Sequence, residues 1–358
     1  MTHPLVSRLL HDPVVSYPRA TVACFDPTCG ELPRRKLDGG RTVQFLERLA
    51  AAGAPAVLIA ASTGHGHLRT PAELAEWFRV AAKAQLGSCV RTALLRPEDG
   101  REENARLLDL LAELAYPVVF VRPGTNVGRP FQADKDGPEG PSYDRKIADN
   151  MRPIVEMGAQ RGLAIGLYSI PDVSGCAMSP DAAAMLVQGP GGQNIVAIKI
   201  TESSYEASTQ KFLNDPRLAR LKIVQGWDPF LARARREGGN RCGVTSGPMS
   251  LAVFQYLHMF AAADRGDWDE LAIAQTAVTA LFQAMQDDVR KFADLQRAKF
   301  IMGLGQPLAG TVTSEQVERV LSTLRTLPRA ADRKRLARSL DLMEDGPFHA
   351  ELARLAET

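Results

Sequence analysis

The sequence lacks the features that mark secreted or membrane-spanning proteins. It has five cysteines in 358 residues, and an odd, scattered set of this kind fits reduced thiols better than a disulfide framework. The longest apolar stretch, 54–61, contains Pro55 and is far shorter than the ~20 residues that span a bilayer. Residues 1–10 have no apolar core of a secretory signal. We therefore expect a soluble, cytoplasmic protein that does not associate with membranes.

An excess of charge of one sign is also missing. The 43 Lys and Arg residues nearly balance 41 Asp and Glu, for a formal net charge of +2, so the sequence has no nucleic-acid-binding footprint. The short basic runs at 34–36 and 333–335 are typical of solvated helix ends. No Gly-x-Gly-x-x-Gly follows the first candidate strand, which argues against a doubly wound dinucleotide-binding sheet. We expect no cofactor and no metal.

What the sequence does have is a repeated alternation of short apolar strands with amphipathic helical patterns. The candidate strands are 21–25, 56–60, 90–94, 118–121, 164–168, 195–199, 222–225 and 242–245. Eight such repeats predict an α/β fold, a (β/α)8 TIM barrel with a C-terminal helical extension. We expect an N-terminal arm at 1–18, the barrel at 19–265 and the helical region at 266–358.

Two segments between the strands also carry information. Pro71, preceded by Thr70 and followed by Glu73, is a typical helix start. The long loop Pro123–Asp144, rich in Gly, Pro and charged residues, has the length of loops that are functional or mobile.

Lys199 is the most informative single residue. It ends the apolar run 195–198 and so lies at the predicted carboxyl end of the sixth strand, where a barrel of this type carries its active site. Burial without a partner lowers the pKa of an ammonium, and a neutral amine can attack a carbonyl carbon to form a Schiff base. The plain alternative is a lysine that extends from the strand end into solvent.

Polar groups at other strand ends suit the same chemistry. The phenol of Tyr168 can move protons during imine formation and bond cleavage. The turn formed by Ser62, Thr63 and Gly64 can offer backbone N–H groups and two hydroxyls to a substrate carboxylate. Alternatively, Tyr168 is a core aromatic and the turn is an ordinary one.

Taken in order, these segments resemble the dihydrodipicolinate synthase/N-acetylneuraminate lyase family of Schiff-base aldolases. Residues 53–73 resemble the family's Gly-Thr-Thr-Gly-Glu loop and the helix after it, 168–171 its Tyr-Asn-x-Pro strand end, and 194–199 its lysine strand. The resemblance implies a lyase, an aldolase or dehydratase, in which Lys199 forms a Schiff base with a 2-oxo acid such as pyruvate and Tyr168 is the proton shuttle. It also implies a homo-oligomer, a tetramer or a dimer.

The positions at which the sequence differs from the family narrow the expected reaction and substrate. The stretch 122–126 has no tyrosine, although the synthases carry a tyrosine pair there, and no counterpart of their substrate-binding arginine can be aligned. We therefore reject dihydrodipicolinate synthase proper. Residues 199–201 resemble the Lys-x-Thr of sialic acid lyases, and 225–228 resemble their Asn-Gly-Tyr-Asp, although Pro229 replaces the glutamate that follows. A hydroxylated or sugar-derived 2-oxo acid is the expected substrate.

The expected site consists of two catalytic residues and a set that binds substrate. The catalytic residues are Lys199 and Tyr168. The substrate-binding residues are Ser62, Thr63, Gly64, His65, Thr201, Gly226, Asp228 and Ser246.

Two other functions remain open at this point. One is a 2-oxo-acid-binding protein of the same fold with reduced catalysis, which the missing tyrosine and arginine would explain. The other is a metal-dependent barrel enzyme that uses His65 and His67, because a His-x-His after a barrel strand can belong to a metal site. We prefer one of these histidines as a polar wall of the substrate pocket and the other as a loop or cap residue.

Overall fold

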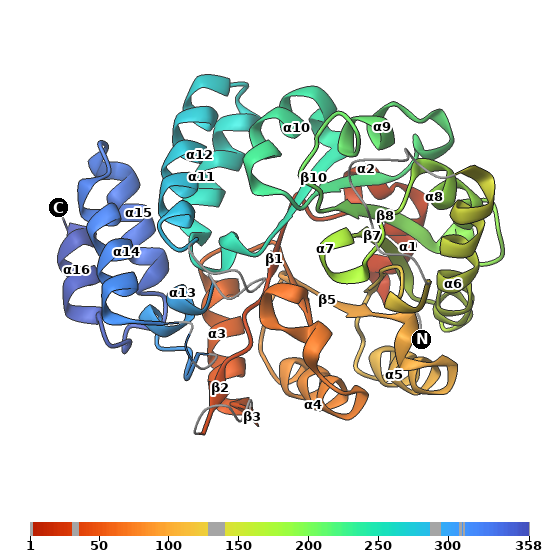
Figure 1. Cartoon of the computed structure of the whole chain (residues 1–358), viewed down its shortest axis with the longest axis horizontal. Coiled ribbons are helices and arrows are strands. Elements are labelled where there is room, and N and C mark those ends of the chain that lie inside the picture. The colour runs from red at the N-terminus through yellow and green to blue at the C-terminus, as the bar shows by residue number, and fades with distance from the viewer. Residues whose placement is uncertain are drawn as a thin grey trace. The chain divides into compact units, whose positions relative to one another are not determined.

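The chain forms a closed barrel of parallel strands with helices between them, as the computed structural model shows (Figure 1). The structure describes residues 3–30, 36–127, 140–286, 295–307, 310 and 312–357. The strands follow the order β1, β10, β9, β8, β7, β6, β5, β4 around the ring. Their bounds are β1 Ala20–Ala23, β4 Ala56–Ile59, β5 Val90–Leu95, β6 Val118–Val121, β7 Ala164–Ser169, β8 Ile195–Ile200, β9 Lys222–Gln225 and β10 Cys242–Ser246.

The predicted barrel is therefore confirmed, with small shifts at the strand ends. β1 ends at Ala23, two residues before the predicted end, whereas β8 continues to Ile200. The extension of β8 follows from pairing, because Ile200 is in register with Ser169 of β7 and Gln225 of β9. A second, antiparallel sheet of β2 (Thr28–Cys29) and β3 (Lys36–Leu37) had no counterpart in the sequence analysis.

Two of the segments singled out above fall partly outside the described residues. Of the basic run 34–36, only Lys36 is described. Of the long loop Pro123–Asp144, residues 128–139 lie outside the described part. The loop begins with a 3-10 turn at Thr125–Val127, and the next helix, α6, starts at Gly140.

One of the two compact units of the chain consists of Met1–Ala20, His67–Phe78 and Val90–Thr245. It holds strands β5 to β10, which carry Lys199 and Tyr168. Its helices are α1 Pro4–His11, α2 Pro13–Ser16, the first part of α4 Pro71–Ala82, α5 Arg101–Glu113, α6 Gly140–Gln160, α7 Pro171–Ser174, α8 Pro180–Val187, α9 Thr209–Asn214 and α10 Leu231–Gly238.

Close packing fills this unit below the level of Tyr168. A Cβ on Gly166 would lie 2.4 Å from the ring of Phe120, so glycine leaves the space that the ring occupies. Phe120 in turn meets the ring of Tyr17 edge-on, with centroids 6.3 Å apart. The first residue of β9, Lys222, donates to Val14 O at 2.9 Å, which ties the N-terminal segment to the amino end of that strand.

The other unit consists of Thr21–Gly66, Arg79–Cys89 and Ser246–Thr358. It holds β4, which pairs with β1 in parallel through Val57 and Val22. Its helices are α3 Gly39–Ala51, the end of α4, α11 Val253–Asp264, α12 Trp268–Gln283, α13 Leu295–Ile301, α14 Ser314–Thr326, α15 Ala330–Leu340 and α16 His349–Glu357. The predicted helical character of the C-terminal region is thus confirmed for the described residues.

Helix starts follow the expected chemistry. At α4, Thr70 N donates to Glu73 Oε2 at 2.7 Å and Glu73 N donates to Thr70 Oγ1 at 3.3 Å, which is the reciprocal capping box. The helix begins at Pro71, as predicted. None of the helices formed by the described residues combines the length and the apolar character needed to cross a membrane.

Candidate active site

Lys199 is the penultimate residue of β8, and its side chain is only 3% exposed. Within the described residues it takes part in no ion pair. Its Nζ instead lies 4.0 Å from the centroid of the Tyr168 ring. Burial lowers the pKa of Lys199 to about 7, and the negative charge of Asp228 only partly opposes this shift. Near neutral pH, Lys199 is therefore an uncharged amine, and so a nucleophile, in a large fraction of the molecules.

Tyr168 faces Lys199 because the two residues are paired in the β7–β8 ladder and paired residues share a face of the sheet. Its hydroxyl accepts a hydrogen bond from Thr201 Oγ1 at 3.3 Å. Burial raises the pKa of Tyr168 above its ordinary value, against the opposing effects of the Thr201 bond and the Arg122 charge. The phenol is therefore protonated at neutral pH and able to donate a proton.

Gly226 makes room for this arrangement. A Cβ at this position would lie 2.0 Å from Thr201 Oγ1 and 3.0 Å from Lys199 Cε. Its N–H donates to Ile200 O at 2.7 Å, which fixes the backbone against the end of β8. Any larger residue would push against both the lysine stem and the hydroxyl that bonds Tyr168.

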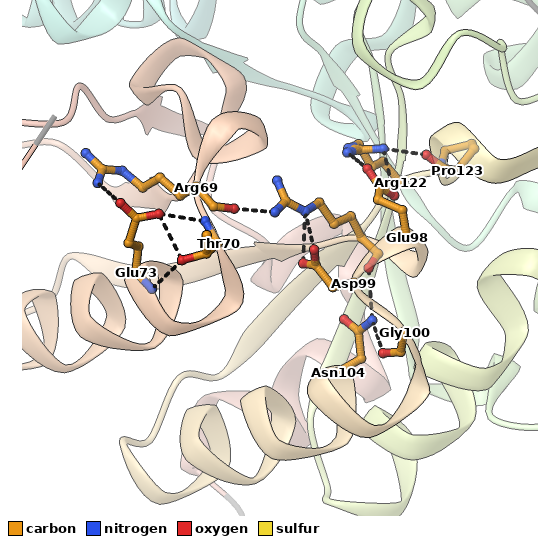
Figure 2. A network of polar contacts seen from close by, with 10 residues as sticks. Arg69, Thr70, Glu73, Glu98, Asp99, Gly100, Asn104, Arg122 and Pro123 are labelled. Atoms are coloured by element: carbon orange, nitrogen blue, oxygen red, sulfur yellow. Dashed lines mark hydrogen bonds and ion pairs between the residues drawn. The ribbon is translucent and has the colours of Figure 1, made fainter. Parts of the chain in front are cut away.

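Arg122 is a site residue whose charge the sequence analysis missed. It follows β6 directly, one step beyond the Val121–Leu167 pair, and so lies at the level of Tyr168. Its guanidinium donates to both oxygens of Glu98 and to Pro123 O at 2.8 Å (Figure 2). The stretch 122–126 had been noted only for its missing tyrosine, yet Arg122 follows a buried run in the same way as Lys199 does.

The Arg122–Glu98 pair belongs to a larger polar network at the carboxyl ends of β5 and β6 (Figure 2). Arg96 pairs with Asp99, Nε to Oδ2, at 2.9 Å, and its guanidinium also donates to Arg69 O. Burial raises the pKa of Asp99, although the Arg96 charge opposes this. The network holds the segments that follow the two strands and keeps the guanidinium of Arg122 neutralised by a carboxylate.

Glu202 is a second charged residue that the sequence analysis missed. Its Oε1 accepts a hydrogen bond from Ser169 Oγ at 2.5 Å, and Ser169 Oγ accepts one from Met178 N at 2.9 Å. Burial raises the pKa of Glu202 to about 7. Because Ser169 adjoins Tyr168 in β7, its side chain points to the opposite face of the strand. Glu202 therefore braces the loop after β7 from the face opposite to Lys199.

The turn after β4 lies in the unit that also holds the C-terminal helices. Ser62, Thr63 and Gly64 form a buried 3-10 turn. The N–H of Gly64 donates to Ala61 O at 3.1 Å, so the turn's donors for a ligand are at Ser62 and Thr63. Ser62 Oγ is buried and makes no hydrogen bond within the described part of the chain.

Two other predicted residues, His65 and Ser246, belong to this unit, whereas His67 belongs to the other unit. His65 is buried, with its Nδ1 3.5 Å from Asp26 Oδ1. Ser246 Oγ bonds the Tyr256 hydroxyl at 2.9 Å, so its hydroxyl already has a partner. His67 lies in the short 3-10 turn Gly66–Leu68. Across the described ranges, no three His, Cys, Asp or Glu side chains come together as metal ligands would.

The structure thus brings together Lys199, Tyr168, Thr201 and Gly226 in one unit, with Asp228 acting on Lys199 through its charge. The contacts that define Ser62, Thr63, Gly64, His65 and Ser246 belong to the other unit.

Comparison with known proteins bears on this arrangement. The model of the dihydrodipicolinate synthetase family matches residues 144–320, which include Lys199 and Tyr168. No curated protein sequence matches.

Solved structures match over most of the chain. A dihydrodipicolinate synthase from Cyanidioschyzon merolae with lysine bound is 21% identical, with a TM-score of 0.69, over 86% of this chain and 97% of that one. A catalytic lysine mutant of the Ruminococcus gnavus sialic acid aldolase is 14% identical, with a TM-score of 0.71, over 90% and 96%. A variant of the Sulfolobus solfataricus 2-keto-3-deoxygluconate aldolase in complex with L-2-keto, 3-deoxy-galactonate is 14% identical, with a TM-score of 0.69, over 92% and 100%.

The closed barrel and its structural neighbours define a fold class, the (β/α)8 barrels. Within that class, the chain is similar to the dihydrodipicolinate synthetase family, whose model matches residues 144–320. The resemblance noted from the sequence is thereby confirmed. At these identities the solved structures establish the fold, and the substrate has to be argued from the site.

Proposed function

We propose that the protein is a lyase, an aldolase or a dehydratase, that holds a 2-oxo acid as a Schiff base on Lys199. One observation carries this most: a buried amine with a pKa lowered to about 7 lies against the ring of Tyr168 at the carboxyl end of β8. A lysine with a purely structural role would be expected to have hydrogen-bond or ion-pair partners when buried.

The proposed chemistry begins with attack of the Lys199 amine on C2 of the 2-oxo acid. The C–N bond forms as the carbonyl electrons move to oxygen. One proton passes from the amine nitrogen to this oxygen and Tyr168 donates a second, so that the oxygen leaves as water and an iminium remains. In an aldol cleavage, the C3–C4 electrons then move to the iminium nitrogen while the C4 hydroxyl gives its proton to the Tyr168 phenolate. In a dehydration, the Tyr168 phenolate instead takes a C3 proton, which leaves an enamine, and then returns the proton to the C4 hydroxyl, which departs as water.

The proposed substrate is a hydroxylated or sugar-derived 2-oxo acid. Thr201 and Asp228 would contact its hydroxylated part, and Gly226 leaves space beside the imine. Two structural neighbours are aldolases of sialic acid and of 2-keto-3-deoxygluconate, which supports this class. Arg122 with its partner Glu98, in place of a tyrosine, supports a reaction other than dihydrodipicolinate synthesis.

Ser62 and Thr63 are proposed to bind a carboxylate. A buried hydroxyl without a partner among the described residues, as at Ser62, is uncommon in folded proteins and calls for an explanation, and a carboxylate ligand would accept its hydrogen bond.

We also propose a homo-oligomer, a tetramer or a dimer, from the resemblance alone. Sedimentation velocity would measure the oligomeric state.

A second candidate is a 2-oxo-acid-binding protein with reduced catalysis. It is favoured by the replacement of the strand-end tyrosine by Arg122, whose guanidinium is neutralised by Glu98 and cannot relay a proton. Such a protein would still form the imine but would not turn over any member of a sugar-acid panel.

Imine trapping tests the proposal directly. The protein is incubated with pyruvate and sodium borohydride, and intact mass and peptide mapping locate the adduct. We expect one added pyruvate-derived group, at Lys199. Absence of an adduct at saturating pyruvate would refute the Schiff-base function, and an adduct without turnover of hydroxylated 2-oxo acids would favour the binding protein.

A further inference from the structure

Three side chains form a row across neighbouring strands at the carboxyl end of the barrel. Tyr168 of β7 is in register with Lys199 of β8. On the other side of β7, the last register pair is Val121 with Leu167, so Arg122 comes next, level with Tyr168. Residues that are level with one another in paired strands share a face of the sheet. The row of Arg122, Tyr168 and Lys199 therefore lies on one face, within the unit that holds β5 to β10.

The charge of Arg122 reaches the phenol of Tyr168. Burial raises the pKa of Tyr168, and the Arg122 charge opposes this shift. The negative charges of Asp172 and Asp228 act in the same direction as burial. The proposed aldol cleavage brings the C4 hydroxyl of the substrate to the phenol oxygen. The carbon chain beyond C4 therefore lies among the charged groups that act on this oxygen.

An arginine in this position would ordinarily offer a binding site to an anionic group, but the guanidinium of Arg122 is already occupied. Its Nη1 donates to Pro123 O at 2.8 Å and to Glu98 Oε2 at 3.3 Å, and its Nη2 donates to Glu98 Oε1 (Figure 2). Glu98 makes no other hydrogen bond or ion pair within the described part of the chain. Its carboxylate thus takes the bidentate position on Arg122 that an anionic ligand would take.

The two partners of this ion pair differ in exposure. The side chain of Arg122 is 2% exposed, and that of Glu98 is 21% exposed. The accessible group of the pair is therefore the carboxylate and not the guanidinium. A carboxylate has about four lone-pair positions, and the bonds from Arg122 leave some of them open. These positions can accept hydrogen bonds from hydroxyl groups, whereas a second anion beside them is repelled.

We propose, on the basis of the lyase function argued above, that Glu98 sets the specificity for the part of the substrate beyond C4. Its carboxylate occupies Arg122 and accepts hydrogen bonds from the hydroxyls of a neutral chain. It also excludes 2-oxo acids that carry a second carboxylate or a phosphate at the far end. The substrate is then a hydroxylated 2-oxo acid whose only anionic group is its 2-oxo carboxylate.

The test compares two 2-oxo acids of equal length that differ in charge at the far end. Borohydride trapping on the full-length protein is titrated with 2-oxopentanoate, which ends in a methyl group, and with 2-oxoglutarate, which ends in a carboxylate. Pyruvate, which has no chain beyond C3, is the reference. For the wild type, we expect a half-saturating concentration of 2-oxoglutarate at least about tenfold above that of 2-oxopentanoate, because like charges meet. Equal half-saturating concentrations would overturn the inference.

Glu98→Ala is the main variant, because it vacates the bidentate position on Arg122 and leaves the guanidinium without its carboxylate. We expect the half-saturating concentration of 2-oxoglutarate to fall about tenfold or more relative to that of 2-oxopentanoate, with pyruvate unchanged. The double substitution Glu98→Ala/Arg122→Met should lose this gain, because it removes the cation as well. Glu103→Gln is the matched control, because it removes one exposed negative charge of α5 in the same unit. It should leave all three compounds unchanged.

Two further results would contradict the proposed role of Glu98. A folded Glu98→Ala variant with an unchanged ratio of the two half-saturating concentrations would overturn the inference, as would a gain that persists in the double variant. Circular dichroism and the melting temperature establish folding. If the alanine variant does not fold, Glu98→Gln keeps the shape of the side chain and an acceptor for Arg122. It should shift the ratio in the same direction, and an unshifted ratio would overturn the inference.

Failure of the wild-type protein to trap pyruvate would instead refute the Schiff-base function itself. Trapping of pyruvate without discrimination between the two longer acids would refute only the role of Glu98, so the two failures are distinguishable.

Discussion

Among the described residues, three lysines are buried, and the groups around each ammonium differ. Lys199, Lys222 and Lys299 are 3%, 3% and 1% exposed. Lys299 pairs with Asp26. Lys222, at the amino end of β9, donates to Val14 O and Asn240 O at 2.9 and 2.6 Å. Lys199, at the carboxyl end of β8, has an aromatic ring beside it.

The comparison teaches that a lowered pKa alone does not identify a nucleophile. Burial lowers the pKa of Lys222 to about 8 and that of Lys199 to about 7. Lys222 nevertheless has two carbonyl acceptors for its protons and lies at the end of the barrel opposite to the active site. Lys199 differs by its place at the carboxyl end and by its neighbour Tyr168, which can exchange protons with a substrate. Position and partners therefore distinguish Lys199, the proposed nucleophile, from Lys222.

The largest expected effect separates Lys199 from Lys222. Lys199→Met should abolish the borohydride adduct with pyruvate and lower turnover of the substrate by ~10³-fold or more, because it removes the amine proposed to form the imine. Lys222→Met should keep the adduct. Intact-mass spectrometry measures the adduct and steady-state kinetics measure the turnover of both variants. An adduct of undiminished yield in Lys199→Met would mean that another residue is the nucleophile.

A smaller loss is expected from the proton shuttle. Tyr168→Phe keeps the aromatic ring beside Lys199 but removes the hydroxyl that Thr201 bonds. General acid–base catalysis contributes ~10²–10⁴-fold, so kcat should fall within this range while the adduct with pyruvate still accumulates, more slowly. Thr201→Val is the milder comparison, because it keeps the phenol and removes the hydroxyl that bonds it. Equal kcat for Tyr168→Phe and wild type would contradict the assigned role.

Stability should respond in opposite directions to removal of Lys199 and of Lys299. The pKa of Lys199 is about 7 in the folded protein and ~10.4 in an unfolded chain, so the unfolded chain binds more protons between these values. Wild-type stability therefore rises with pH in this window. Lys199→Met removes the cost of burying a protonated amine. We therefore expect the free energy of unfolding to rise by a few kcal/mol, as an order of magnitude, at and below pH 7, and this gain should disappear above about pH 10.5.

Lys299→Met, in contrast, leaves the Asp26 carboxylate buried without its cation and should lower stability by about 3–5 kcal/mol. Urea denaturation of both variants and the wild type at pH 7 and pH 9 measures the comparison. A stabilised Lys299→Met, or a destabilised Lys199→Met at pH 7, would reverse the assignment of the two lysines.

The sequence was sufficient to predict the parts of this site that depend on strand periodicity. Lys199 and Tyr168 each lie near the end of a short apolar run, and parallel pairing of these runs places both on one face. The same logic could have found Arg122, which follows the run 118–121. Its pairing with Glu98 could not be foreseen, because it depends on side-chain reach across the ends of two neighbouring strands.

Contacts between distant segments could not be predicted from the sequence, for a different reason. His65 and Gln296 are 231 positions apart, and Asp26 and Lys299 are 273 apart. Helical periodicity indicated that the C-terminal region is helical, but it does not specify which helix face meets which turn. His65 is predicted from the sequence to be a substrate-binding residue. In the structure its side chain is buried, and its Nδ1 lies close to the carboxylate of Asp26.

The smallest expected effect concerns the charge of Asp228, which acts on Lys199. Asp228 raises the pKa of Lys199, although burial dominates. Asp228→Asn removes this stabilisation of the ammonium, so the pKa of Lys199 should move further down, by less than about one unit. The rate of imine formation rises with pH as the amine becomes neutral, so the midpoint of this rise should shift from near 7 to a lower pH. Trapping rates with pyruvate between pH 5 and pH 9 measure the shift, and Asp228→Glu, which keeps the charge, should stay close to the wild type. A midpoint that moves upward in Asp228→Asn would mean that Lys199 is stabilised as an ammonium by some other group, and the contrast with Lys299 would then no longer hold.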